Sequence, residues 1–351
     1  MKFSFTLSIS LLGWIAFFHP TDLCAKVYTS YFTGDTSDVK TPSTGVTVLM
    51  GGATEDRNAM IWFLQHSGGG DVVVLRASGS DGYNKYLYTE LGQKVNSVES
   101  ILCHNDSSGY DPYIIRQVLN AEALWFAGGN QANYVRYWNN TLLDSAIQYV
   151  INVKRIPVGG TSAGMAILGS IVYSAENGGI QSPKALTNPY DSAVTLLKDD
   201  FIRQRWLKGV ITDTHYDARE RQGRHVVFIA RIIQDYGEPA YGIAAEEYTA
   251  VCIEANGLAR VYGDPSRGDF AYFIRPAKRR PKAPGRCMPG QSLHWEENRS
   301  ALKVYRVPGT PDGSHSFQLT NWKKGSGGSW QDWYVVNGVL EMKDGAVAPK
   351  K

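Results

Sequence analysis

Residues 155–173, RIPVGGTSAGMAILGSIVY, contain the local elements that decide the fold. We expect a strand over residues 155–158, a sharp turn over residues 160–164 (GTSAG) and a helical run over residues 165–173. A serine held between glycines, after a strand and before a helix, is typical of a nucleophile elbow, because glycines relieve the crowding that Cβ atoms would cause. Free N–H groups at the start of the helix can stabilise an oxyanion. The pattern therefore predicts Ser162 as a nucleophile and the Ala163 N–H as an oxyanion donor.

Short apolar strands alternate with helices upstream of this turn. We expect strands over residues 45–50, 71–76, 97–103 and 123–126, and helices over residues 58–65, 111–121, 131–138 and 142–153. This alternation predicts a doubly wound parallel sheet with helices on both faces. The sites of such folds lie at the carboxyl ends of the strands. Glycine pairs follow three of the expected strands, and the pair Gly128-Gly129 is expected to supply the second oxyanion donor.

The composition changes near residue 276. Residues 275–286 (RPAKRRPKAPGR) are basic and rich in proline, which favours a solvated linker over a nucleic-acid patch at this short length. Strand-like patterns follow over residues 302–307, 316–319 and 333–339. We expect a catalytic domain over residues 26–277, followed by a linker and a small β-rich C-terminal extension over residues 278–351.

The overall composition excludes two classes of protein. The 351 residues include 36 basic and 33 acidic side chains, a net charge of +3, which argues against a dedicated nucleic-acid binder. A disordered chain would be poorer in aromatic residues and would have a larger net charge, so the composition argues against one. Since no His, Cys and Asp residues cluster at metal-ligand spacing, we expect neither a metal nor another cofactor.

The N-terminus has the pattern of a secretory signal peptide. Lys2 precedes an uncharged apolar run over residues 3–18, and cleavage is expected after Ala25. The chain is then secreted or periplasmic, with no membrane span after cleavage. An uncleaved anchor is one alternative. A lipoprotein at Cys24 is another, although Leu23 is larger than such a site needs.

Signal removal would leave three of the four cysteines. Cys103 and Cys252 lie in apolar strand-like runs and are expected to be buried thiols. Cys287 follows the basic linker, and its pairing with either of them stays open.

A serine nucleophile needs a base and an orienting acid. Among the histidines beyond the signal segment, His215 follows the apolar pair Val210-Ile211 and precedes three closely spaced arginines. Such arginines would bind substrate carboxylates, or else form a solvated helix face. The candidate acids are Glu176, Glu246 and Glu247. The last two begin the alternating strand-like segment 242–253, and spacing alone does not choose among the three.

Five motifs, in this order and spacing, resemble the cyanophycinase and peptidase E family of serine exopeptidases over residues 45–275. They are residues 51–53 (GGA), 128–131 (GGNQ), 160–164 (GTSAG), 213–224 (DTHYDARERQGR) and 242–251. The resemblance implies the flavodoxin-like fold of class I glutamine amidotransferases, with serine replacing cysteine. It also implies a Ser-His-Glu triad. Ser162 then looks like the nucleophile and His215 like the base. Glu247 looks like the acid, because the family's acidic residue before x-Thr-Ala fits residues 247–250, with Glu246 and Glu176 as alternatives.

The resemblance also implies a substrate. Cyanophycinase acts on a β-aspartyl-arginine unit, and the matching binding positions here are Gln131, Asp213, Thr214, Arg219, Arg221 and Arg224. Thr214 stands where cyanophycinase has glutamine, a departure that bears on the preferred dipeptide. We therefore expect a secreted serine exopeptidase for β-aspartyl-arginine or isoaspartyl peptides, and a homodimer by family analogy.

Other activities are kept as alternatives. One is an α-aspartyl dipeptidase or another peptidase for acidic residues, and another is a non-catalytic binding module that retains the pocket. A glutamine amidotransferase component is disfavoured by the serine in the elbow and by the expected export.

Overall fold

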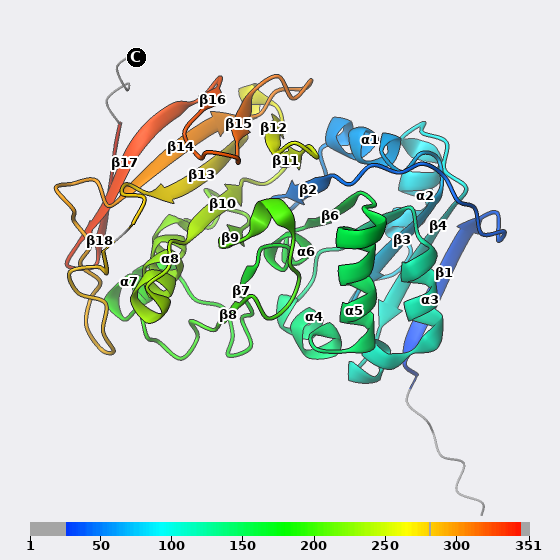
Figure 1. Cartoon of the computed structure of the whole chain (residues 1–351), viewed down its shortest axis with the longest axis horizontal. Coiled ribbons are helices and arrows are strands. Elements are labelled where there is room, and N and C mark those ends of the chain that lie inside the picture. Colours follow the sequence, from blue (N-terminus) through cyan, green and yellow to red (C-terminus); the bar gives the residue numbers. More distant parts are fainter. Residues whose placement is uncertain (1–25, 281, 345–351) are drawn as a thin grey trace, which may run out of the picture.

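The computed structural model describes residues 26–280 and 282–344, so the expected signal peptide lies outside the described residues. The chain forms two β-sheets flanked by helices (Figure 1). The first sheet contains, in spatial order, β1 (Tyr28–Gly34), β4 (Ser97–Cys103), β3 (Asp71–Arg76), β5 (Ala123–Phe126), β6 (Val158–Thr161), β2 (Thr47–Met50), β11 (Ala250–Ile253), β12 (Leu258–Tyr262), β15 (Ser316–Gln318) and β16 (Gly325–Ser326). Its five strands from β4 to β2 are parallel, which is the expected α/β core.

The second sheet contains, in spatial order, β18 (Val339–Asp344), β17 (Ser329–Val336), β14 (Leu302–Pro308), β13 (Phe270–Pro276), β10 (Tyr241–Ala245), β9 (Val210–Asp213), β7 (Ile171–Tyr173) and β8 (Leu196–Lys198). Strands β7, β9 and β10 are parallel, and the others are antiparallel to their neighbours. The strands after residue 300 extend both sheets, so the β-rich C-terminal part packs directly on the α/β body.

The α-helices cover both faces of the first sheet and one face of the second. They are α1 (Arg57–Gln65), α2 (Gly82–Lys85), α3 (Pro112–Asn120), α4 (Gln131–Trp138), α5 (Leu142–Tyr149), α6 (Ala163–Ala166), α7 (Ser182–Thr187) and α8 (Gln222–Tyr236). In β3, Val72 and Val74 join the core beneath α1, whereas Val73 and Leu75 join the core with α3, α4 and α5. This alternation follows from the period of two in a strand. Figure 1 shows α7 and α8 lying against the second sheet.

The expected elements around the serine turn need two corrections. The strand lies at Val158–Thr161 rather than at residues 155–158, so Gly159 lies inside it. There it makes room for Trp125, which a Cβ would approach to 2.5 Å. The helix expected over residues 165–173 is only the single turn α6, because the chain passes into β7 of the second sheet.

Two further segments were expected as single strands and form two strands each. Residues 242–253 divide into β10 and β11, which belong to different sheets, with a turn at Tyr248 whose φ is +63°. Residues 333–339 lie across β17 and β18, a hairpin that turns at Asn337 and Gly338. Both of these residues have positive φ, as a two-residue hairpin turn requires. The patterns of β1, β7, β8, β12 and β13 were not recognised from sequence.

Candidate active site

Ser162 lies at the carboxyl end of β6 in a strained turn. Its φ and ψ are 51° and −114°, a conformation that non-glycine residues rarely adopt. The two flanking glycines make the turn sterically feasible. A Cβ on Gly160 would lie 2.6 Å from the carbonyl carbon of Gly164, and one on Gly164 would lie 2.1 Å from the carbonyl oxygen of Phe126. The backbone thus has the geometry of a nucleophile elbow.

His215 lies just after β9 and faces the serine from the second sheet. Its Nε2 atom is 2.8 Å from Ser162 Oγ, and its Nδ1 atom is 2.6 Å from Glu247 Oε1. A neutral imidazole with its proton on Nδ1 would donate to the carboxylate and accept from the hydroxyl. The three side chains therefore form one continuous hydrogen-bonded row, and they come from the ends of β6, β9 and β10.

The two other candidate acids have different partners. Glu246 accepts hydrogen bonds from the backbone N–H groups of Asp217, Ala218 and Glu247, the last two at 2.9 and 2.7 Å. Glu176 is exposed and accepts from Ser174 Oγ at 3.1 Å. Among the three glutamates, Glu247 is the one that contacts His215.

The surroundings of His215 favour its neutral form. Burial lowers the pKa of the imidazole, and the positive charges of Arg219 and Arg221 lower it further, whereas the hydrogen bond to Glu247 opposes the shift. The net direction is downward. A neutral imidazole at neutral pH is the form that can accept a proton from a hydroxyl.

The expected oxyanion donors lie beside the serine. A Cβ built on Gly128 would lie 3.6 Å from Ser162 Cβ, which places the loop after β5 next to the nucleophile. Within the described part of the chain, the N–H groups of Gly128 and Gly129 have no hydrogen-bond acceptor. Ala163 is the first residue of α6, where a backbone N–H has no partner within the helix. These N–H groups are available to a developing negative charge.

The loop after β2 connects the three segments, a role that the sequence did not reveal. The carbonyl oxygens of Met50, Gly51 and Gly52 accept hydrogen bonds from the N–H groups of Ser162 (3.0 Å), His215 (2.9 Å) and Tyr248 (3.0 Å), respectively. A Cβ on Gly52 would lie 2.3 Å from His215 Cε1, so only glycine fits against the imidazole. The pair Gly51-Gly52 at the end of β2 was the sequence feature that could have indicated this role.

The expected substrate-binding residues divide into buried and accessible groups. Asp213 and Arg224 are buried and form a bidentate ion pair, with Arg224 Nε 2.8 Å from Asp213 Oδ2. Burial alone would raise the pKa of Asp213, but the guanidinium of Arg224 outweighs it and the pKa is lowered. Thr214 is buried as well, and its carbonyl and hydroxyl oxygens accept from Arg221 at 2.8 and 3.0 Å. Asp213, Thr214, Arg221 and Arg224 are therefore linked to one another through these contacts.

Arg219 and Gln131 lie closer to solvent. Arg219 is exposed, and its side chain forms no ion pair with any described residue. Gln131 is half-buried at the first position of α4, beyond the Gly128-Gly129 loop. Burial lowers the pKa of Arg221 to about 10, so this side chain also stays charged at neutral pH. Arg221 Nη1 also lies 3.6 Å from Asp213 Oδ1, so Asp213 faces two guanidiniums, and the exposed Arg219 is the arginine of this group with no ion pair among the described residues.

A pocket that includes Tyr248, the residue after Glu247, contains charged residues that sequence reasoning missed. It opens next to Tyr248 and is lined by Thr54, Glu55, Asp56, Arg57, Tyr248, Asp264, Arg267 and Asp269. The exposed guanidinium of Arg267 stacks on the ring of Tyr248, 3.9 Å from its centroid. Acidic and basic side chains therefore both lie next to Tyr248.

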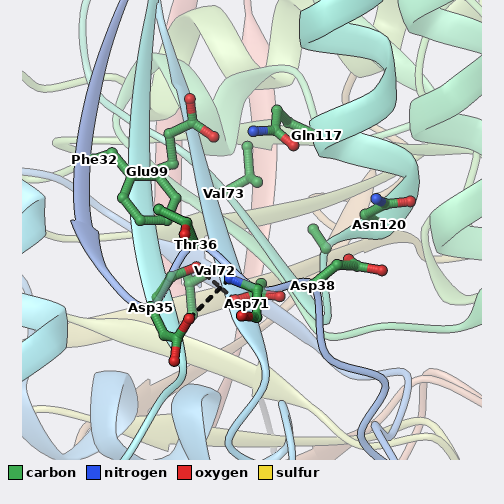
Figure 2. Close-up of a pocket in the computed structure, with 13 residues that line it drawn as sticks. Phe32, Asp35, Thr36, Asp38, Asp71, Val72, Val73, Glu99, Gln117 and Asn120 are labelled. Carbon is green, nitrogen blue, oxygen red and sulfur yellow. Dashed lines mark hydrogen bonds between the residues drawn. The ribbon is translucent and has the colours of Figure 1, made fainter.

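Figure 2 shows a different pocket, at the opposite end of the parallel strands. It is lined by Asp71 and Glu99 of the first sheet, whose carboxylates have protein partners, and by Asp35 and Asp38, which follow β1. Asp71 accepts from Asn96 Nδ2 at 2.8 Å and from Ser97 Oγ at 2.5 Å, and Glu99 accepts from Tyr113 at 2.7 Å. We interpret this pocket as a structural junction between β1, β3 and β4.

The described residues also provide information on metal binding, on the cysteines and on membrane-spanning helices. They contain no cluster of His, Cys, Asp and Glu that could hold a metal ion. Cys103, Cys252 and Cys287 are buried free thiols, and burial raises the pKa of Cys103 to about 11. No helix in residues 26–280 and 282–344 is long and apolar enough to cross a membrane.

The fold and the site together define a hydrolase with a serine nucleophile. The model of peptidase family S51 matches residues 73–261, and the chain belongs to this family. The cyanophycinases of Synechococcus elongatus and Thermosynechococcus vestitus are each 23% identical over 227 residues. This match covers 62% of the chain and 66% of either relative, slightly less than two thirds of their length. The crystal structure of a peptidase from an acI-B1 Actinobacterium is 17% identical, covers 64% of this chain and 90% of that one, and has a TM-score of 0.46.

Proposed function

We propose that the protein is a serine peptidase that hydrolyses amide bonds through a Ser162-His215-Glu247 triad. The observation that carries this proposal is the row of contacts from Ser162 Oγ to His215 Nε2 (2.8 Å) and from His215 Nδ1 to Glu247 Oε1 (2.6 Å). Membership of peptidase family S51 supports the same reaction class.

In the first half-reaction, His215 Nε2 accepts the proton of Ser162 as Oγ bonds to the amide carbonyl carbon. The N–H groups of Ala163 and of the Gly128-Gly129 loop stabilise the oxyanion, and Glu247 stabilises the imidazolium. The C–N bond then breaks, and the leaving amine takes the proton from His215. Water attacks the acyl-enzyme with His215 again as the base, which releases the acid and restores the serine.

The charges of the site favour a substrate with a carboxylate next to the cleaved bond. Arg219 is exposed and has no ion pair among the described residues, and the single carboxylate of Asp213 is shared by the charged side chains of Arg221 and Arg224. A β-aspartyl linkage carries a free α-carboxylate beside the amide, which a guanidinium can bind with two hydrogen bonds. The two relatives from Synechococcus elongatus and Thermosynechococcus vestitus are named cyanophycinases. We therefore propose exopeptidase action on β-aspartyl-arginine and isoaspartyl peptides.

Product analysis tests both parts of this proposal. Purified protein is incubated with cyanophycin, β-aspartyl-arginine and matched α- and β-aspartyl dipeptides, and products are identified by mass. We expect cleavage of the β-linked substrates and none by Ser162→Ala. A wild-type rate for Ser162→Ala would refute the nucleophile. Cleavage of α-linked peptides alone would make the protein an α-aspartyl dipeptidase. Failure of a serine-reactive phosphonate to label Ser162 would favour a binding module without turnover.

The mature chain is proposed to act outside the cytoplasm. The charged start, the apolar run over residues 3–18 and Ala25 support export with cleavage after residue 25. N-terminal sequencing of the protein from the exported fraction of an expressing cell tests this. A chain that keeps residues 1–25 in that fraction would contradict cleavage, and recovery in the cytoplasm alone would contradict export.

A further inference from the structure

Strand β14 of the C-terminal part is connected in register to the strand that leads into the acid of the triad. Ala244 of β10 pairs with Tyr272 of β13, and Tyr272 pairs with Arg306 of β14. Just beyond β10, the N–H of Glu246 donates to the carbonyl oxygen of Phe270 at 2.9 Å. The guanidinium of Arg306 lies over the ring of Phe270, 3.3 Å from its centroid. The C-terminal segment thus contacts the strand that holds the Glu246-Glu247 turn.

A row of polar contacts continues from Arg306 into the loop of the base. Arg306 Nε donates to the hydroxyl of Tyr272 at 3.0 Å. That hydroxyl donates to the carboxylate of Asp217, whose two oxygens are 2.9 and 2.7 Å away. Gln222 Nε2 donates to the same carboxylate at 2.7 Å. Tyr272 is buried, and burial together with Asp217 raises the pKa of its hydroxyl, so it remains a donor at all ordinary pH values.

Asp217 is two residues from His215, and its backbone is tied to the acid. The N–H groups of Asp217 and Ala218 both donate to one carboxylate oxygen of Glu246, and the other oxygen accepts from the N–H of Glu247. The turn that carries His215 and the turn that carries Glu247 are therefore joined through Glu246. His215 itself has a φ of +46°, so its turn depends on such external contacts.

From these contacts we infer that Arg306 and Tyr272 are positioning residues for the triad, so that the C-terminal extension is part of the catalytic apparatus. The inference rests on the proposed serine peptidase function. Neither side chain contacts Ser162, His215 or Glu247 directly. They act through Asp217 and the backbone of its turn, and their loss should change the alignment of His215 rather than substrate affinity.

The test compares Tyr272→Phe, Arg306→Leu, their double variant and the control Lys303→Leu. Tyr272→Phe keeps the ring and removes only the hydroxyl. Lys303 is a cation on the same strand, but it pairs with Asp332 at 2.5 Å within the C-terminal part. The readouts are kcat and KM for β-aspartyl-arginine, the pH dependence of kcat/KM, the rate of Ser162 labelling by a fluorophosphonate, and Tm.

We expect Tyr272→Phe and Arg306→Leu each to lower kcat and the labelling rate about tenfold, with KM within about twofold, because misalignment affects the transition state. The acid limb of kcat/KM should shift in both variants and stay in place in Lys303→Leu. The double variant should fall no more than about twofold below Tyr272→Phe, since both changes interrupt one row of contacts.

Wild-type rates and an unshifted acid limb in Tyr272→Phe would overturn the inference while leaving the proposed function intact. Fully additive losses in the double variant would overturn the coupling between the two residues. A wild-type chain whose Ser162 is neither labelled nor needed for hydrolysis would overturn the proposed function, and this inference with it. If Arg306→Leu does not fold, Arg306→Lys and Tyr272→Phe are compared with Lys303→Leu by the same measurements.

Discussion

The replacement Glu247→Gln tests the most specific feature of the site, the contact of 2.6 Å between Glu247 and His215 Nδ1. The amide oxygen can still accept this hydrogen bond, but the negative charge that stabilises the imidazolium is lost. Loss of the acid costs about 10⁴-fold in kcat in Ser-His-acid triads. Because 28% of the Glu247 side chain is exposed, solvent screens its charge, and we expect about a 10³-fold loss.

The pH dependence gives a second, independent signature. Burial lowers the pKa of His215, and the carboxylate of Glu247 partly offsets this. Without the carboxylate the pKa should fall further. The base acts only when neutral, so activity is lost as the pH falls through this pKa. The acid limb of kcat/KM should therefore move to lower pH while the plateau falls.

The assay is the initial rate of β-aspartyl-arginine hydrolysis across the acid limb and the plateau. Glu246→Gln is the matched control, because Glu246 accepts only backbone N–H groups. Its amide leaves at least one N–H without an acceptor, which should cost about 1–3 kcal/mol of unfolding free energy. Its effect on kcat should remain well below that of Glu247→Gln. A Glu247→Gln enzyme that keeps kcat within about tenfold of wild type would refute the assignment of the acid.

Three other changes test the scaffold of the site. Gly164→Ala should prevent folding or abolish activity, because its Cβ would lie 2.1 Å from a carbonyl oxygen at the end of β5; Gly179→Ala, with open space around its Cβ, should express and melt like wild type. Asp213→Asn should lower the urea-derived unfolding free energy by about 3–5 kcal/mol, since it leaves the buried charge of Arg224 unpaired; an unchanged midpoint would contradict that pairing. Burial lowers the pKa of His225 from 6.5 to about 4, so the folded chain resists protonation more than the unfolded chain does. The contribution of His225 to the free energy of unfolding is complete above about pH 6.5 and falls by about 3 kcal/mol toward pH 4. Urea titrations of His225→Gln should therefore show a smaller loss of stability over this pH range.

Local patterns in the chain were enough to predict the parallel core and the serine turn. The strands β3, β4 and β5 have the expected bounds, because short β-branched and apolar runs have few alternatives to a buried strand. The serine turn was recognisable because the G-x-S-x-G pattern between a strand and a helix is local, although glycine is required at position 164 by the distant carbonyl oxygen of Phe126. The expected serine, histidine and Glu247 lie in one hydrogen-bonded row, although their catalytic roles remain predictions.

The remaining features depend on segments that are distant in the sequence. Glu246 and Glu247 are chemically identical neighbours, and their different partners follow only from how β10 leaves the second sheet and β11 enters the first. The pairing of Asp213 with Arg224 turns two expected ligands of the substrate into a buried support, which depends on where α8 packs. The division of the C-terminal strands between the two sheets likewise cannot be read from their alternation. A periodic pattern specifies which face of a strand is apolar, but the choice of neighbouring strand comes from long-range packing.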